Sequence, residues 1–359
     1  MNKHVDYLII GGGIAGLMMA YQLEKNGLSF LLIDEGKNSS SSKVAAGMFN
    51  PISGKRMTVN WRADELLETL HASFVDFEKL LNKNYLVQAD ILQAFGNVKE
   101  SNDFFVQLEK AQFNKYIEIA PAKQDALNDE FGSFGVKGSG WVKTSEWIAD
   151  YQAYLLKNNK LIYRTTNWDE LKRKGEQWLW REKVFNKVVS CEGFQVNQNP
   201  YFDWLPFKLC KGQVLHILCK GLNPHIILKK GVYLVHQFED VYKVGATYEW
   251  DFEDEMANET GQEMLLQKLS KLLVLPFEVV NREAGIRPTT RDRAAILGEH
   301  PHLKNLYCFN GLGTKGMLQA PFLSAHLLAH IETKSELLKE VNIQRFKEFY
   351  TNSHPLETV

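Results

Sequence analysis

Three glycines and an aspartate near the amino terminus have types and spacing suited to binding a phosphate and a ribose. Gly11, Gly13 and Gly16 lie close together, and Asp34 follows Gly11 by 23 positions (34 − 11). Gly11 permits a tight turn, Gly13 lets the backbone approach a pyrophosphate, and Gly16 allows a helix to pack closely on a strand. An acid at this distance can accept hydrogen bonds from ribose hydroxyls. The four residues therefore predict a dinucleotide-binding turn.

A strand, a helix and a second strand are needed to position these residues. The apolar run 7–10 is typical of a strand buried on both faces of a parallel sheet. Residues 14–26 carry apolar residues at helical spacing and end at Gly27, and a second apolar run covers 30–33. The amino end of that helix would present unsatisfied N–H groups to the phosphates. The predicted cofactor contacts from this β-α-β unit are Gly11, Gly13, Ile14, Ala15, Gly16, Asp34 and Glu35.

A serine-rich stretch and a run of small residues follow the second strand. Ser39 to Ser42 lead into Val44-Ala45-Ala46-Gly47-Met48-Phe49-Asn50-Pro51. Small residues let the backbone approach a flat ring system closely. Composition alone fits a flexible serine loop equally well. The predicted ring contacts are Ser41, Ser42, Ala46, Gly47 and Met48.

Length and charge set limits on the class of protein. The chain has 359 residues, of which 45% are hydrophobic, enough for a large core and for two structural units. Lysine and arginine number 42 against 43 aspartates and glutamates. This balance gives no electrostatic reason to expect a nucleic acid or an anionic membrane as partner, and it favours a small-molecule substrate.

The cysteines argue against a metal site. Cys191, Cys210, Cys219 and Cys308 contain no CxxC pair, so we expect reduced thiols, no zinc and no dithiol redox centre. The apolar run 7–20 is broken by glycines, lacks a signal-cleavage pattern and is too short to span a bilayer. We therefore expect a cytoplasmic protein.

Motifs over nearly the whole chain resemble those of the D-amino acid oxidase and glycine oxidase family of FAD-dependent oxidoreductases. The motifs are Ala45-Ala46-Gly47-Met48, Gly212-Gln213-Val214, Gly245-Ala246-Thr247, Gly285-Ile286-Arg287-Pro288-Thr289-Thr290-Arg291-Asp292, Asn310-Gly311-Leu312-Gly313-Thr314-Lys315-Gly316-Met317 and Ala320-Pro321. The resemblance implies an α/β fold, with a Rossmann-like FAD-binding domain of the glutathione reductase type and an interleaved α+β substrate domain on a mainly antiparallel sheet. The implied FAD-binding domain covers 1–65, 139–205 and 286–359, and the substrate domain covers 66–138 and 206–285.

By this resemblance, Arg287 holds the substrate carboxylate. A guanidinium can bind a carboxylate through two parallel hydrogen bonds, and Pro288 biases Arg287 toward an extended backbone. Without the resemblance, an ion pair of Arg287 with Glu283 or Asp292 is the simpler interpretation. The resemblance also places Tyr233 in the substrate pocket, where its hydroxyl can bond the carboxylate, whereas core packing is the alternative.

The same resemblance implies further contacts to FAD. The helix-like run 317–331 would direct its amino terminus, helped by Lys315, at the pyrimidine edge of the flavin and stabilise the negative charge that forms on reduction. The strand that ends near Cys191 would border the ribityl chain or pyrophosphate, and the Trp168 backbone would border the adenine. These predicted contacts are Trp168, Cys191, Gly193, Gly313, Thr314, Lys315, Gly316 and Met317. Relatives that bind FAD covalently use a cysteine near Gly285, which this chain lacks, so we expect non-covalent FAD.

The resemblance implies an enzyme that oxidises the C–N bond of a small amine or amino acid by hydride transfer to the flavin. D-amino acids, glycine and N-alkyl glycines are the substrate types, and oxygen or another acceptor reoxidises the flavin. Basic residues at Lys55, Arg56, Arg291 and Arg293 put glycine itself in doubt.

Three other functions stay open at this point. The first is an MnmC-like tRNA-modification oxidase that removes a carboxymethyl group from a modified uridine, against which the missing basic bias counts. The second is an FAD-dependent 2-hydroxy acid dehydrogenase, because a fold does not fix a function. The third is a flavin-binding protein without turnover.

Overall fold

The computed structural model describes residues 4–37, 40–54, 57–119 and 121–353, and the chain divides into two compact units. Unit 1 contains Met1–Lys43, Ile148–Cys210 and Ile286–Val359, and unit 2 contains Val44–Trp147 and Lys211–Gly285. The predicted FAD-binding segments overlap the three segments of unit 1. Residues 44–65 and 139–147, however, lie in unit 2, and residues 206–210 lie in unit 1. Which unit holds which part of the cofactor stays a prediction.

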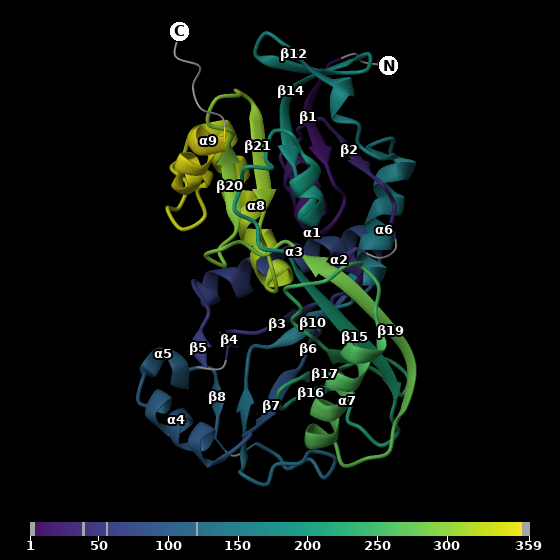
Figure 1. Ribbon diagram of the computed structural model, residues 1–359, viewed down its shortest axis with the longest axis vertical. Helices are drawn as coiled ribbons and strands as arrows, with labels where there is room; N and C mark the ends of the chain where they lie inside the picture. Colours follow the sequence, from purple (N-terminus) through teal and green to yellow (C-terminus); the bar gives the residue numbers. More distant parts are fainter. Residues whose placement is uncertain (1–3, 38–39, 55–56, 120, 354–359) are drawn as a thin grey trace. The chain divides into compact units, whose positions relative to one another are not determined.

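Unit 1 is built on a parallel sheet with β1 (His4–Ile10) at its centre (Figure 1). β1 pairs in parallel with β2 (Phe30–Asp34) on one side and β14 (Lys183–Ser190) on the other. β11 (Leu161–Tyr163) continues the parallel sheet beside β2, and β21 (Leu306–Asn310) does so beside β14. Residues Tyr7–Ile10 of β1 are buried, as the continuous apolar run predicts.

Helices and antiparallel strands complete unit 1. α1 (Ile14–Lys25) and α8 (Gly316–Thr333) pack against each other, and α6 (Thr144–Lys157) precedes β11. The antiparallel strands are β12 (Leu171–Lys174), β13 (Gln177–Trp180) and β20 (Ile296–Glu299). The remaining elements are α2 (Ser41–Val44), η1 (Trp168–Glu170), η2 (Gly193–Gln198), η3 (Ile343–Phe346) and α9 (Lys347–Ser353).

Unit 2 is built on a second, mainly antiparallel sheet. Its strand order is β19 (Glu278–Arg287), β15 (Cys210–Leu218), β18 (Val241–Gly245), β17 (Tyr233–Phe238), β16 (Ile226–Lys229), β7 (Asp90–Ala94), β9 (Ser133–Val136) and β8 (Ile117–Glu118). β16 and β7 pair in parallel. Smaller sheets contain β3 (Met48–Phe49), β10 (Gly140–Val142) and β6 (Leu86–Gln88), and β4 (Ile52–Ser53) with β5 (Thr58–Val59).

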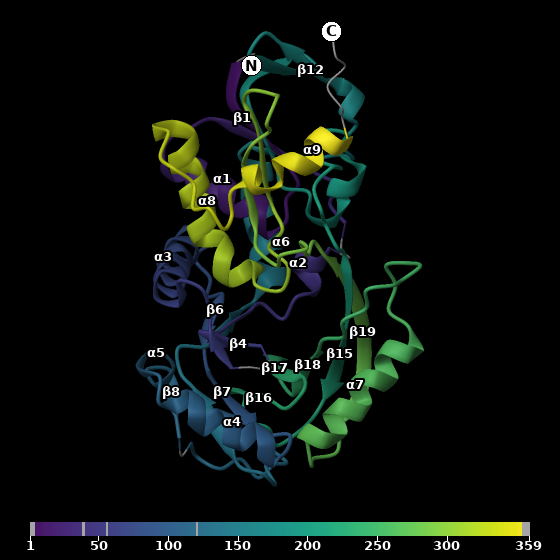
Figure 2. The ribbon, with the colours of Figure 1, turned by 60° about the vertical axis from the view of Figure 1, so that its left-hand side comes forward.

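Two apolar clusters cover the faces of the large sheet in unit 2, and helices flank this sheet in Figure 2. Leu265 and Leu269 of α7 (Glu259–Leu272) pack on Leu215 of β15 and its neighbours. Phe104 of α4 (Val98–Leu108) and Phe113 of α5 (Ala111–Asn114) belong to the other cluster. α3 (Ala63–Leu81) also lies in this unit. The parallel sheet of unit 1 and the mainly antiparallel sheet of unit 2 confirm the predicted fold class.

None of the helices in the described part of the chain has the length and apolarity that crossing a membrane requires.

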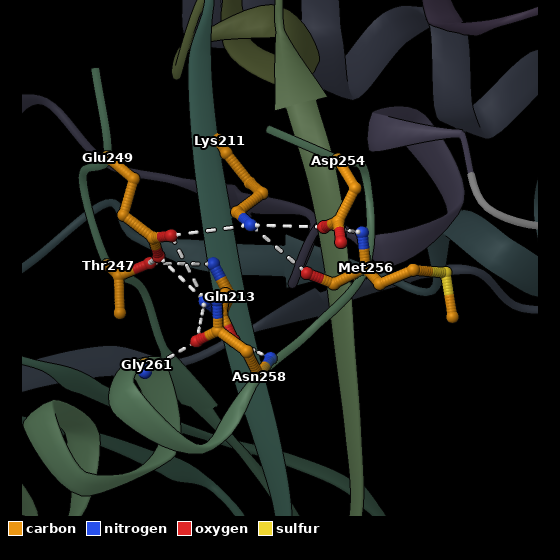
Figure 3. Close-up of polar contacts among 8 residues, drawn as sticks. All are labelled: Lys211, Gln213, Thr247, Glu249, Asp254, Met256, Asn258 and Gly261. Atoms are coloured by element: carbon orange, nitrogen blue, oxygen red, sulfur yellow. Dashed lines mark hydrogen bonds and ion pairs between the residues drawn. The ribbon is translucent and has the colours of Figure 1, made fainter. Parts of the chain in front are cut away.

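A buried polar network fixes the start of α7 (Figure 3). Lys211 is 2% exposed, and its Nζ lies 3.1 Å from the Met256 carbonyl oxygen and 3.5 Å from a Glu249 carboxylate oxygen. Gln213 Nε2 donates to Glu249 and to Asn258 Oδ1. Asn258 Oδ1 also accepts the Gly261 N–H of α7 at 2.9 Å, as a helix N-cap does. The network therefore connects the first turn of α7 to β15.

We expect Asn258→Ala to lower the free energy of unfolding by roughly 1–2 kcal/mol, because it removes a cap and leaves Gln213 with a missing acceptor. Urea titration of the purified variant measures the change. Asn97→Ala is the matched control, because Asn97 caps α4 through a single bond to the Glu100 N–H. A loss at Asn258 no larger than the loss at Asn97 would show that the network adds nothing to the cap.

Candidate active site

The predicted phosphate-binding turn lies between β1 and α1 in unit 1. Gly11 has a φ of 99°, which favours glycine, and a Cβ on Gly16 would lie 1.8 Å from the Gly11 carbonyl oxygen. Asp34 accepts the Gly12 N–H at 2.6 Å and the Gly36 N–H at 2.8 Å. Gly12, which lies between two predicted cofactor contacts, is an additional residue of the turn that the spacing of Gly11, Gly13 and Gly16 does not predict. The turn is thus held against α1 by the contact of Gly16 with Gly11, and against Asp34 by hydrogen bonds from backbone N–H groups to the Asp34 carboxylate.

Gly13 and Ser42 meet at the amino terminus of α1. Gly13 is the N-cap residue, the Ile14 N–H donates to Ser42 Oγ at 3.2 Å, and a Cβ on Gly13 would lie 2.9 Å from that oxygen. Ala15 is buried beside Ile14 in the first turn, and Ser41 is half-buried at the start of α2. A bare glycine at this helix end suits the close approach of a phosphate, so the residues present fit the pyrophosphate of a dinucleotide.

The carboxyl end of β14 lies against the same turn. The Cys191 N–H donates to the Ile10 carbonyl at 2.7 Å, and a Cβ on Gly11 would lie 2.5 Å from the Cys191 carbonyl oxygen. Asn310 Nδ2 donates to the Gly193 carbonyl at 2.8 Å. Cys191 therefore lies against the turn, whereas Gly193 is held by the end of β21. The cofactor contacts of both residues stay predictions.

Two predicted adenosine contacts have other neighbours within unit 1. Glu35 accepts a hydrogen bond from Gln195 Nε2 at 2.9 Å and pairs with Lys37 at 2.7 Å. The Trp168 ring lies 5.6 Å from the Tyr201 ring and packs on the core beneath β12 and β13. Neither residue is joined to the turn by these contacts, so their cofactor roles stay predictions.

Glu192 is a titratable group at this site that the sequence analysis missed. It follows Cys191, and its carboxylate accepts hydrogen bonds from Ser190 Oγ at 2.7 Å and Asn199 Nδ2 at 2.6 Å. Burial raises the pKa of Glu192 to about 7 despite these two bonds. An acid after a strand gives no sequence signal that would distinguish it from a surface residue.

The segment that contains Ala46, Gly47 and Met48 lies in unit 2 and is held by three neighbours. Gly47 has a φ of 69°, and a Cβ there would lie 1.9 Å from the Val142 carbonyl oxygen. Thr144 Oγ1 donates to the Ala45 carbonyl, and Lys243 Nζ donates to the Val44 carbonyl, both at 3.0 Å. Thr144 and Lys243 give no sequence signal for this role, because both are distant in sequence from the segment. Their bonds fix the course of this backbone.

The glycine-rich loop before α8 has the predicted geometry of a helix amino terminus. Gly313 has a φ of 54°, Lys315 is the N-cap residue, and α8 starts at Gly316 with Met317 buried. Thr314 is exposed. Burial lowers the pKa of Lys315. The helix end and the nearby cation can together stabilise negative charge.

Arg287 is half-buried at the end of β19. Its Nη1 lies 3.7 Å from Cys210 Sγ. Of the two acids that the sequence offered as structural partners, Glu283 pairs with His216 at 2.7 Å and with Lys243 at 3.6 Å. Asp292 pairs with Arg345 at 2.8 Å. Glu283 and Asp292 therefore form ion pairs with Lys243 and Arg345, respectively.

Tyr233 begins β17 in unit 2 and has two polar neighbours there. Asn50 Nδ2 lies 3.4 Å from the Tyr233 hydroxyl, and Lys229 Nζ lies 5.0 Å from the centre of the Tyr233 ring.

Of the basic residues that put glycine in doubt as a substrate, two belong to the described part of the chain. Arg291 and Arg293 are exposed, and Lys55 and Arg56 lie outside the described residues.

Comparison with known families gives a match over most of the chain. The profile of the DAO family, described as FAD dependent oxidoreductase, matches residues 6–331. The chain belongs to this family. It is an enzyme, an FAD-dependent oxidoreductase, and the glycine turn, Asp34 and the helix end at Gly13 provide a fitting site for its FAD.

Individual relatives are distant. The chain is 23% identical to the tRNA 5-methylaminomethyl-2-thiouridine biosynthesis bifunctional protein MnmC of Leptospira borgpetersenii, over 90% of this chain and 56% of that protein. The chain thus spans little more than half the length of this relative. It is 24% identical to glycine oxidase of Bacillus subtilis, over 96% of this chain and 98% of that protein. The crystal structure of glycine oxidase from Geobacillus kaustophilus has the same fold, with a TM-score of 0.75 and 21% identity, over 94% of this chain and 96% of that chain.

We expect Gly13→Val to yield folded protein that lacks FAD. The new side chain occupies the space that the pyrophosphate needs, and within the protein it displaces the Ser42 hydroxyl. Visible absorbance measures bound FAD, and far-UV circular dichroism measures folding. Gly96→Val is the control, because Gly96 is exposed and its new Cβ meets only the end of the Glu100 side chain. A yellow, fully loaded Gly13→Val protein would contradict the phosphate assignment.

Glu192→Gln should stabilise the protein above pH 7. Because the folded pKa of Glu192 is raised from 4.5 to about 7, wild-type folding binds a proton in this window and its stability falls as pH rises through it. The amide carries no such penalty, so we expect a gain of roughly 1–3 kcal/mol at pH 8 that disappears at pH 4.5. Thermal unfolding at both pH values measures it, with Glu340→Gln at an exposed position as control. A gain of equal size at both pH values would show that ionisation of Glu192 is not its cause.

Proposed function

We propose that this enzyme oxidises the C–N bond of an amine that carries a carboxylate, such as a D-amino acid, glycine or an N-alkyl glycine. The observation that carries this proposal is the placement of Arg287, a half-buried guanidinium at the end of β19 in an FAD-dependent oxidoreductase. Glycine oxidase, a relative by sequence and by structure, gives the proposal its reaction type.

Arg287 is assigned the binding of the substrate carboxylate. A planar guanidinium forms two parallel hydrogen bonds with a carboxylate, and partial burial strengthens them because water competes less. Tyr233 is assigned a further hydrogen bond to the substrate, since the Asn50 amide lies against its oxygen and leaves its proton to donate.

Orientation, rather than acid–base chemistry, is the task of the protein in this reaction. FAD, when bound, supplies the hydride acceptor. The binding residues hold the neutral amine so that its α-carbon can lose a hydride, and water hydrolyses the resulting imine. A protein base at the α-carbon is not required, because positioning of the substrate and the electrostatics of the flavin supply most of the catalysis. Oxygen or another acceptor then takes up the electrons.

A second candidate is oxidation of a carboxymethylamino group on a modified uridine of tRNA. The observation that favours it is the likeness to MnmC proteins over nine-tenths of this chain. The carboxylate of that substrate would use Arg287 in the same way. The balance of 42 basic and 43 acidic residues counts against a large RNA-binding surface. The small amine therefore remains our first proposal.

Arg287→Leu should raise KM for the carboxylated amine by one to several powers of ten and leave FAD bound, because only the substrate loses its anchor. Steady-state kinetics and the visible spectrum check both parts. Arg291→Leu, an exposed arginine four positions on, is the matched control and should keep the wild-type KM. Equal KM values for wild type and Arg287→Leu would show that the carboxylate is bound elsewhere.

A further inference from the structure

Glu192 lies directly beside the turn that fits the pyrophosphate of a dinucleotide. A Cβ on Gly11 would lie 3.0 Å from the Glu192 Cα and 2.5 Å from the Cys191 carbonyl oxygen, so the chain leaves β14 in contact with this turn. Three residues after Glu192, the Gln195 side chain donates to Glu35, the residue that follows β2, at 2.9 Å. All of these residues belong to unit 1, so the segment that carries Glu192 is fixed against the turn within one unit.

Two neutral donors hold the Glu192 carboxylate. Its Oε2 accepts a hydrogen bond from Ser190 Oγ at 2.7 Å and from Asn199 Nδ2 at 2.6 Å, and both donor residues are fully buried. Asn199 is itself fixed, because its Oδ1 accepts the Tyr201 N–H at 2.9 Å. Within the described part of the chain, no lysine or arginine forms an ion pair with Glu192. The charge of an ionised Glu192 is therefore not neutralised by a paired cation.

The other titratable groups that act on Glu192 do not neutralise it either. Glu35 adds a second negative charge. The Cys191 and Cys308 thiols both interact with Glu192, and burial raises the pKa of each thiol, so both stay uncharged. The Arg345 guanidinium acts on Cys308 and has its ion pair elsewhere in unit 1. The surroundings of Glu192 thus favour its uncharged form.

Ionisation of Glu192 changes the charge that a pyrophosphate meets at this turn. Burial raises the pKa of Glu192 to about 7, so its charge changes in neutral solution. A pyrophosphate brings two further negative charges to a place from which water is partly excluded, and like charges repel strongly there. The amino terminus of α1 offers only about half an elementary positive charge in return. A buried acid with such a pKa beside a ligand site is a candidate for a functional role.

We propose that Glu192 must be protonated for tight binding of FAD, so that the protein takes up a proton when FAD binds in neutral to alkaline solution. The affinity for FAD then falls as the pH rises, and pH controls how much of the enzyme carries its cofactor. In acid, Glu192 is already protonated before FAD binds, and the affinity no longer changes with pH. The inference concerns the cofactor alone and does not depend on the substrate.

The test titrates ADP-ribose into the full chain from which FAD has been removed. ADP-ribose carries the same pyrophosphate between two riboses, keeps its charge between pH 6 and pH 8.5, and has no flavin that could respond to Lys315. We expect the Kd of wild type to rise roughly tenfold over this range, since a single proton changes Kd at most tenfold per pH unit. Glu192→Gln should bind at every pH about as tightly as wild type binds at pH 6. Glu340→Gln, at an exposed position, is the control and should keep the wild-type rise.

Two further measurements decide the question if Glu192→Gln does not fold. Isothermal titration calorimetry of wild type in buffers of different ionisation enthalpy counts the protons taken up with the ligand. We expect roughly half a proton or more per ligand at pH 8 and none at pH 5.5. Ser190→Ala removes one donor to the ionised carboxylate, so the pH at which Kd begins to rise should move upward.

Three results would overturn the proposal. The first is a wild-type affinity that stays constant from pH 6 to pH 8.5, or a rise in Kd that Glu192→Gln retains. The second is binding at pH 8 without proton uptake. The third is a pH dependence of FAD binding that ADP-ribose does not share, which would assign the effect to the flavin end of the cofactor, where Lys315 is predicted to act. If ADP-ribose binds too weakly to measure, the same titrations with FAD decide through the comparison of wild type with Glu192→Gln.

Discussion

The close contact between the turn after β1 and the first turn of α1 is the constraint on which the cofactor site depends. A Cβ on Gly16 would lie 1.8 Å from the Gly11 carbonyl oxygen, so helix and turn can approach this closely only with glycine at position 16. The contact sets the direction of α1 and therefore the place to which its unsatisfied N–H groups point. The same turn supports the Cys191 backbone on one side and Asp34 on the other. The turn thus holds α1, the Cys191 backbone and Asp34 through three neighbouring contacts.

Local chemistry explains which parts of this arrangement could be predicted. Gly11, Gly13, Gly16 and Asp34 are recognisable because each answers a backbone or hydrogen-bond requirement that few residues meet. The helix at Ile14–Lys25 and the strand at Phe30–Asp34 follow from apolar spacing in the same direct way. The fold class and FAD were predicted by resemblance, and the family match over residues 6–331 confirms both.

Other site residues could not be found because they act over long distances in sequence. Lys243 holds the Val44 carbonyl from 199 positions away, and Thr144 holds the Ala45 carbonyl from 99 positions away. Burial raises the pKa of Glu192, and the burial of a single acid cannot be predicted from the sequence.

The central claim is that the enzyme removes a hydride from the carbon next to a nitrogen in a carboxylated amine. Anaerobic mixing of the yellow protein with D-amino acids, N-substituted glycines and 2-hydroxy acids, followed through flavin absorbance, tests it most directly. The account predicts that amines bleach the flavin and that 2-hydroxy acids do not. Bleaching by 2-hydroxy acids alone would contradict it and identify a hydroxy acid dehydrogenase, and silence toward every small compound with bleaching by modified tRNA would contradict the choice of a small substrate.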